Sequence, residues 1–460
     1  MSHPLPVSSV SRRTLLRAGL AGVGLAALAP SLSGCAAKSS SSGAQADQLS
    51  MWWWGQQNYD GQGKVMDALL AEYQKTEGRP TVKHVLQGTD ETIPAYETAA
   101  QAKKGPDIAT LWYGAYMFPS VWKGNVEPLT GLVPPSETDH WLDAKYSVYD
   151  DKLYASGVCG DGAAILYNKD HFRKAGLDPD APPTTWADLI SSVKALRSAG
   201  FTPFGAGVKD GWFGVVFMNF VVPQRAGGSP ARLLIDATSG KTSWTDPQLA
   251  DLWERLAELR DARAFNENVT SLDYFEGRQE FSSNAATMTF SGSIPAALQA
   301  VRTLGPEKAG IMAAPDLEDS RGGFLPGMPL TQFVTPFSAD KQASADLLAW
   351  LHGPDAQQMM YELSDGIMMP VDDRFDFDQV EEPWLRTVYD QVRDSMERGI
   401  PYADGIVPYD ILSAGPMQAT TLSFTEREDP AAAARRCQEA ADNWRKLNPD
   451  IVGLYSEWQV

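Results

Sequence analysis

The 460-residue sequence has few cysteines, few histidines and a deficit of basic residues. Three cysteines and five histidines are little material for a disulfide framework or a zinc centre. Lys and Arg number 39 against 58 Asp and Glu, and the formal net charge is −19. Such an acidic chain is repelled by nucleic acid and by anionic lipid surfaces. We therefore expect no nucleic-acid partner, no metal and no cofactor.

Signatures of catalysis are missing as well. The nucleophile elbow G-x-S-x-G, the phosphate-binding G-x-x-x-x-G-K-[ST] and the zinc-protease H-E-x-x-H do not occur. His84, His140, His171 and His352 are scattered singly, which is typical of structural histidines. We therefore expect no enzyme. A secreted glycan-active enzyme stays open as the alternative, because 58 acidic residues guarantee accidental carboxylate pairs.

Long apolar runs are also missing, except near the N-terminus. Ser11-Arg12-Arg13-Thr14 leads into an apolar run over 18–30, which is shorter than the roughly 20 residues that a membrane-spanning helix needs. A basic stretch, a short apolar region and small residues at its end make a secretory signal. The paired arginines indicate the twin-arginine route.

Leu32-Ser33-Gly34-Cys35 resembles the bacterial lipoprotein box, in which the cysteine is lipidated and becomes the first mature residue. A buried cysteine beside an ordinary cleavage site is the alternative. We predict a signal peptide over 1–34 and a flexible tether over 35–48, which is rich in Ser, Ala and Gln. The lipid on Cys35 would then hold the exported protein at the outer face of the cell membrane.

The remaining cysteines, Cys159 and Cys437, lie far apart and in no C-x-x-C motif. This spacing favours two separate buried thiols over a disulfide, although a disulfide stays possible in an exported protein.

About 410 mature residues predict two lobes rather than one core. Strands are expected over 49–54, 81–86 and 108–113 and a helix over 61–75, and this alternation indicates α/β lobes. Later helices follow the capping residue Thr185 and the pair Asp246-Pro247. Further helices are expected over 343–351, 354–363 and 431–447.

Aromatic residues gather in polar, Gly-rich stretches over 52–59, 112–116 and 210–214. A sugar ring presents apolar C–H faces that pack on aromatic rings, and hydroxyls that pair with polar side chains. Such stretches therefore suit a sugar site. The alternative is that the aromatics belong to the core. We favour the core for Trp52, on an alternating strand, and the site for Trp212.

Several motifs occur in a fixed order along the chain. They are Gly105-Pro106-Asp107-Ile108 with Trp112, Leu166-Tyr167-Asn168-Lys169-Asp170, Pro183-Thr184-Thr185-Trp186, Phe275-Glu276-Gly277 and Leu348 to Gln357. Over nearly all of the mature chain this series resembles the carbohydrate-binding group of extracellular solute-binding proteins of ABC importers.

The resemblance implies a two-lobed periplasmic-binding-protein-like α/β fold of type II, with several chain crossings at the hinge. Lobe 1 is predicted over 49–159 and 331–372, and lobe 2 over 160–330 and 373–460. The protein is expected to close on its ligand as a monomer and to be read by a membrane permease.

Carried over position by position, the resemblance places ligand contacts at Gln56, Gln57, Trp112, Asp161 and Trp212. The glutamines stand where relatives have charged sugar contacts, and Trp112 and Trp212 match stacking rings. A further set of candidates lies in segments near the expected cleft: Trp54, Tyr116, Asp210, Gly292, Met328, Asp365, Gly366 and Met417.

We therefore expect a lipid-anchored receptor for a sugar, and specifically an oligosaccharide, that delivers its ligand to an ABC permease. A receptor for a peptide, a polyamine or a phosphorylated polyol is the alternative among binding proteins.

Overall fold

Strands and helices alternate along the chain, and the strands form two larger sheets and one small two-stranded sheet. The computed structural model describes residues 47–56, 58–225, 229–317, 322–323, 325–398 and 402–459. The predicted signal peptide, Cys35 and Gln57 lie outside the described residues. The strands are β1 (Gln48–Trp53), β2 (Thr81–Leu86), β3 (Ile108–Trp112), β4 (Val148–Tyr149), β5 (Lys152–Leu153), β6 (Ser156–Gly162), β7 (Ala164–Asn168), β8 (Thr202–Phe204), β9 (Ala286–Ser291), β10 (Ala309–Met312) and β11 (Gly327–Val334).

The helices occupy most of the remaining chain. They are α1 (Gln62–Tyr73), α2 (Thr89–Gln101), α3 (Phe118–Trp122), α4 (Pro135–Thr138), α5 (Lys169–Lys174), α6 (Trp186–Ser198), α7 (Trp212–Arg225), α8 (Pro230–Ser239), α9 (Pro247–Asp261), α10 (Tyr274–Ser282), α11 (Ile294–Leu304), α12 (Lys341–His352), α13 (Pro354–Leu363), α14 (Pro383–Glu397), α15 (Tyr409–Leu412), α16 (Gln418–Thr425), α17 (Pro430–Leu447) and α18 (Pro449–Glu457). Short 3₁₀ turns include η1 (Gly114–Tyr116) and η4 (Ala403–Ile406).

The expected strands and helices are confirmed. Thr185 caps α6 by accepting a hydrogen bond from the backbone of Asp188, and Asp246 caps α9 in the same way from Gln248.

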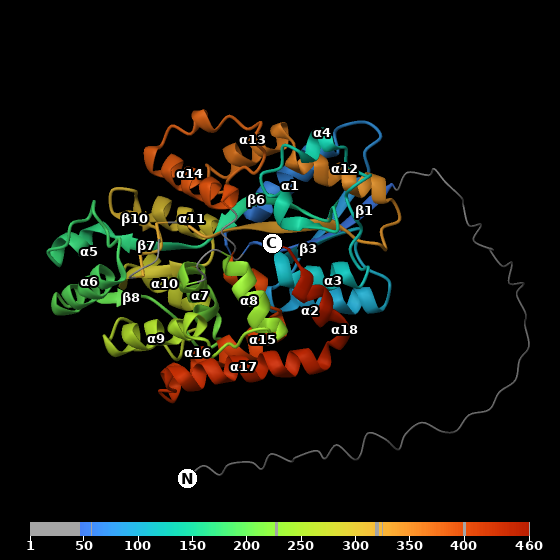
Figure 1. Ribbon diagram of the computed structural model, residues 1–460. Coiled ribbons are helices and arrows are strands. Elements are labelled where there is room, and N and C mark those ends of the chain that lie inside the picture. The colour runs from blue at the N-terminus through green and yellow to red at the C-terminus, as the bar shows by residue number, and fades with distance from the viewer. Residues whose placement is uncertain are drawn as a thin grey trace, which may run out of the picture. The chain divides into compact units, whose positions relative to one another are not determined.

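The first sheet has the strand order β2-β1-β3-β11-β6. β1 pairs in parallel with β2 and β3, and β11 runs antiparallel to β3 and β6. Helices α1, α12 and α13 lie over one face of this sheet, and α2 lies against the other (Figure 1). Parallel strands need helical crossovers, which explains why helices cover both faces.

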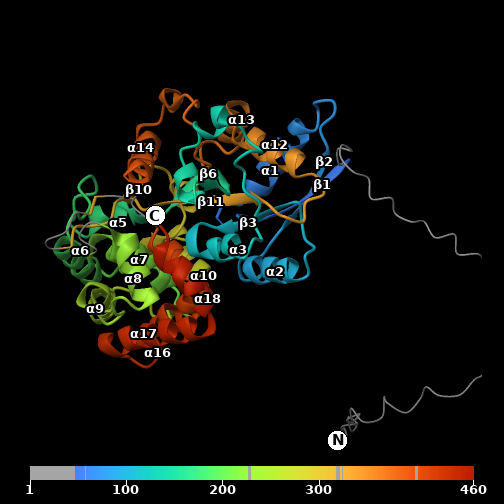
Figure 2. The same cartoon turned by 45° about the vertical axis from the view of Figure 1, so that its right-hand side comes forward.

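The second sheet has the order β10-β7-β9-β8. Helices α6, α7, α10 and α11 pack against it. Figure 2 shows this sheet and its helices on one side of the molecule, with α17 along their lower edge, while α1, α2 and α12 stay with the first sheet.

The chain passes directly from one sheet to the other at Ala163. β6 ends at Gly162 in the first sheet, and β7 begins at Ala164 in the second. Ala163 N–H donates to the Pro326 carbonyl at 2.8 Å, immediately before β11 begins. A Cβ on Gly162 would lie 2.1 Å from the same carbonyl oxygen, so the two neighbouring connections require a glycine there.

β6 thus continues past the predicted boundary at 159/160 to Gly162, and β11 begins at Gly327, before the predicted boundary at 330/331. Membership of a sheet does not define a rigid body, so the predicted division into lobes stays a prediction.

Asp107 of the Gly-Pro-Asp-Ile motif joins three segments of the chain at the start of β3. Its Oδ2 accepts from the backbone and the hydroxyl of Ser50, both at 2.7 Å, and its Oδ1 accepts from the Ser338 hydroxyl at 2.9 Å. One carboxylate therefore ties β1, β3 and the segment after β11 together.

Trp53 belongs to the core at 1% exposure, together with Leu49 and Met51 of β1, while Trp52 is only half-buried. The expectation that Trp52 belongs to the core was wrong because side chains alternate along a strand, and the chain turns the Trp53 face inward. Cys159 and Cys437 are both buried and unbonded to each other, which confirms two separate thiols.

His352 is a structural histidine. Its Nε2 lies 2.9 Å from Oδ1 of the buried Asp143, and its ring stacks on Trp141. In the described part of the chain, no helix combines the length and the apolar character that a membrane crossing requires.

Candidate ligand-binding pocket

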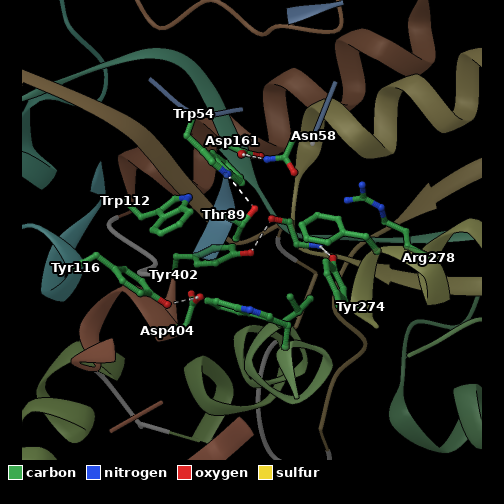
Figure 3. Close-up of a pocket in the computed structure, with 14 residues that line it drawn as sticks. Trp54, Asn58, Thr89, Trp112, Tyr116, Asp161, Tyr274, Arg278, Tyr402 and Asp404 are labelled. Atoms are coloured by element: carbon green, nitrogen blue, oxygen red, sulfur yellow. Dashed lines mark hydrogen bonds between the residues drawn. The ribbon is translucent and has the colours of Figure 1, made fainter. Parts of the chain in front are cut away.

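A pocket lies between the two sheets, where loops from both converge (Figure 3). Its lining comprises Trp54, Asn58, Thr89, Trp112, Tyr116, Asp161, Trp212, Val216, Tyr274, Phe275, Arg278, Gly292, Tyr402 and Asp404. Trp54 follows β1 and Trp112 ends β3, both in the first sheet. Trp212 begins α7, which packs against the second sheet. The ends of parallel strands are the usual place for ligand sites in α/β proteins.

Aromatic rings form a continuous wall. The rings of Trp54 and Trp112 meet edge to face with centroids 5.0 Å apart, and Trp112 meets Tyr116 at 5.6 Å. On the other side Trp212 stacks on Tyr409 at 6.2 Å, and Tyr409 lies 6.4 Å from Tyr116. Trp54 is held in place by its Nε1, which donates to Thr89 Oγ1 at 3.0 Å. These contacts help to hold the rings in place at the pocket.

Asp161 at the end of β6 links the two sides of the pocket. Its Oδ1 accepts from the backbone N–H groups of Gly162 and Ile294, both at 2.8 Å, and its Oδ2 accepts from Asn58 Nδ2 at 3.3 Å. Ile294 is the first residue of α11, so the carboxylate also faces a helix N-terminus. Burial raises the pKa of Asp161 to about 7, against the lowering effect of the Gly162 and Ile294 backbone, the Ser293 side chain and the Arg278 charge.

Asp404 in η4 is a second buried carboxylate, at 6% exposure. Its Oδ2 accepts from the Tyr116 hydroxyl at 3.3 Å. Its Oδ1 has no hydrogen-bond partner among the described residues. Burial raises the pKa of Asp404 to about 7, and the polar groups of Asn219, Tyr116 and Gly405 oppose that rise.

Tyrosine hydroxyls fix the backbone of Gly292 at the pocket wall. Tyr402 donates to the Gly292 carbonyl at 2.9 Å, and Gly292 N–H donates to the Tyr274 hydroxyl at 2.6 Å. A Cβ at Gly292 would lie 2.7 Å from Val216, so a larger residue would push into α7.

The centres of water molecules can occupy about 70 Å³ in the pocket. Since about 10–15 Å³ on this measure is enough for one water, the pocket has room for several waters.

Six of the predicted ligand contacts line this one pocket: Trp112, Asp161, Trp212, Trp54, Tyr116 and Gly292. Gln56 instead folds back on its own loop, where it accepts from Gly63 N–H at 2.8 Å and donates to the Asp60 carbonyl. Its amide is therefore already engaged.

Asp210, Asp365, Gly366 and Met417 lie outside the lining. Asp210 accepts from the backbone N–H groups of Trp212 and Tyr274 and shares a separate hollow with Met417. Asp365 is exposed and faces Arg302, and Gly366 adjoins it with a positive φ. Met328 pairs with Asp161 through the β11–β6 ladder.

Sequence reasoning missed Asn58, Thr89, Tyr274, Phe275, Arg278, Tyr402 and Asp404 as lining residues. The stretch Tyr402-Ala403-Asp404-Gly405 has the aromatic, polar and glycine composition that marked 112–116, so the same signal was present. No cluster of three metal-ligating side chains occurs within the described residues.

Residues 68–384 match the family of bacterial extracellular solute-binding proteins. The chain belongs to this family. The sn-glycerol-3-phosphate-binding periplasmic protein UgpB of Rhizobium meliloti is a curated relative with 25% identity over 170 residues. That match covers 35% of this chain and 39% of UgpB, so the chain spans well under two thirds of the relative's length.

Solved structures share the fold of this family member. A chain solved in work on xylan utilization by Caldanaerobius polysaccharolyticus has a TM-score of 0.72 at 21% identity, covering 85% of this chain and 99% of that one. The GacH receptor of Streptomyces glaucescens, solved without ligand and with acarbose, has a TM-score of 0.68 at 19% identity, covering 88% and 100%. These likenesses confirm the predicted two-lobed α/β fold.

The two raised carboxyl pKa values predict how stability changes with pH. Between about pH 4 and 7 the folded chain holds protons on Asp161 and Asp404 that the unfolded chain has released, so the free energy of unfolding falls as pH rises. For each unit by which the pKa of either carboxyl is raised, the free energy of unfolding falls by up to roughly 1.4 kcal/mol over this pH range.

Asp404→Asn should therefore reduce the fall in melting temperature of the ligand-free protein between pH 5 and pH 8. If the melting temperatures of wild type and variant fall equally between these pH values, the pKa of Asp404 lies near its ordinary value instead.

Proposed function

We propose that this solute-binding protein is a receptor that takes a sugar into the pocket between its sheets and presents it to an ABC permease. One observation carries the proposal: an aromatic wall encloses two carboxylates and several hydroxyls in a single pocket. Rings offer flat apolar surfaces to the C–H faces of a sugar, and carboxylates accept from its hydroxyls. The acarbose complex of the GacH receptor is in keeping with this ligand class.

Binding would be coupled to movement of the two lobes. Residues from both sides of the pocket line it, so the ligand would enter an open form and be touched from both sides in a closed one. Only the closed form makes contacts from Trp112 and Trp212 together, so the ligand would shift the population toward closure. The crossing segments at Ala163 and Pro326 are the natural hinge. The closed form would be the one that the permease reads, with no chemical turnover of the ligand.

A phosphorylated polyol is the second candidate, because the curated relative named above is described as an sn-glycerol-3-phosphate-binding protein. It would need a cluster of positive charges. Among the described residues, the pocket lining contains one guanidinium, Arg278, beside two carboxylates, and this charge balance favours an uncharged ligand.

The direct test is a calorimetric screen of residues 49–460 against maltotriose, xylotriose, N,N′-diacetylchitobiose and acarbose, with sn-glycerol 3-phosphate, a peptide and a polyamine as comparison solutes. We expect saturable binding of one sugar, recovered intact. Binding of only the charged solutes would contradict the sugar receptor, and a cleaved glycan would support the glycan-active enzyme.

Trp212→Ala should weaken binding of the sugar found in that screen by about 1 to 3 kcal/mol, because one packing surface is lost. Trp384→Ala is the matched control: Trp384 is partly buried on α14, contacts Arg302, and lies outside the pocket lining. Equal affinities of the Trp212 variant and the control would remove Trp212 from the site.

Attachment to the membrane rests on the motif at Cys35, and we propose that the mature protein is held there by a lipid on this residue. Cells that express the full chain should incorporate labelled fatty acid into the wild type and not into Cys35→Ser. Incorporation into both proteins would refute the lipid site.

A further inference from the structure

Polar groups that face the pocket differ in how fully the protein satisfies them. Asp161 accepts three hydrogen bonds, from Gly162, Ile294 and Asn58. The hydroxyls of Tyr402 and Tyr274 are both engaged with the backbone of Gly292. These groups therefore already do structural work in the ligand-free molecule.

Asp404 is different. It is more than nine-tenths buried and lines the pocket, and its Oδ1 has no hydrogen-bond partner in the described part of the chain. An unpaired buried carboxylate oxygen costs free energy, because it has lost its hydrating water without gaining another donor. A site that tolerates this cost is often one where a ligand supplies the missing donor.

The surroundings of Asp404 fit a hydroxyl donor. Figure 3 shows Asp404 next to Tyr116, below Tyr402, on the side of the pocket formed by the aromatic rings. Tyr116 fixes the carboxylate through Oδ2 at 3.3 Å, which leaves Oδ1 for another partner. The guanidinium of Arg278 lowers the pKa of Asp161, so the positive charge in the lining acts on the other carboxylate.

We propose that Asp404 is a ligand-binding residue whose Oδ1 accepts a hydroxyl of an uncharged polyhydroxylated ligand and whose charge disfavours anionic solutes. Asp161, by contrast, mainly holds the two sides of the pocket together. The inference rests on the proposed function, since it names the residue and the ligand charge for that same pocket.

The test compares Asp404→Asn with Asp161→Ala by calorimetry and thermal melting at pH 8, with the sugar that binds the wild type in the screen above. Asp404→Asn should weaken binding at least tenfold and leave the melting temperature of the ligand-free protein unchanged or higher, because a buried charge is removed. Asp161→Ala should lower that melting temperature, because three donors lose their acceptor. Asp390→Asn, a change of the same type at an exposed position of α14, should match the wild type in both measurements.

The experiment distinguishes failure of the Asp404 proposal from failure of the proposed function. Unchanged sugar affinity in Asp404→Asn would overturn the role of Asp404 alone. A wild type that binds sn-glycerol 3-phosphate and no sugar would overturn the ligand class and the proposed function together.

Discussion

The two sheets are joined by neighbouring segments that cross at Ala163 and Pro326, and the rest of the molecule depends on this connection. Ala163 N–H donates to the Pro326 carbonyl, and Gly162 leaves no space for a side chain at that point. Because the crossings lie side by side, the loops of both sheets converge on one pocket. In the proposed receptor, the same arrangement would let the sides separate with little change inside either sheet, since hinges act through a few residues at element ends.

The pocket combines two demands that conflict in the absence of a ligand. Flat aromatic surfaces must exclude water, yet carboxylates and hydroxyls must stay available to a polar solute. Asp161 and Asp404 are both buried, and burial raises the pKa of each to about 7. Hydrogen-bond donors of the protein offset the burial of Asp161. These hydrogen bonds also link Asn58 to the start of α11. One oxygen of Asp404 has no hydrogen-bond partner among the described residues, and the proposed place for a ligand hydroxyl rests on this difference.

Much of the fold was predictable from sequence because strand alternation, helix caps and ordered motifs are local. Thr185 and Asp246 are helix caps as expected, and Trp112, Asp161 and Trp212 meet in one pocket although they lie far apart in the chain. The predictions that failed concern residues whose positions depend on tertiary contacts. The face of β1 turns Trp53 inward rather than Trp52, Gln56 bonds to its own loop, and Asp404 reaches the pocket from a short turn that carries no family motif.

The most direct measurement is a crystal structure of residues 49–460 with the sugar selected by calorimetry. The account predicts a closed form with the sugar ring between the aromatic residues of both lobes, in contact with Trp112 and Trp212, and one hydroxyl within hydrogen-bond distance of Asp404 Oδ1. A sugar bound elsewhere on the surface, with the pocket between the sheets still holding only water, would contradict it.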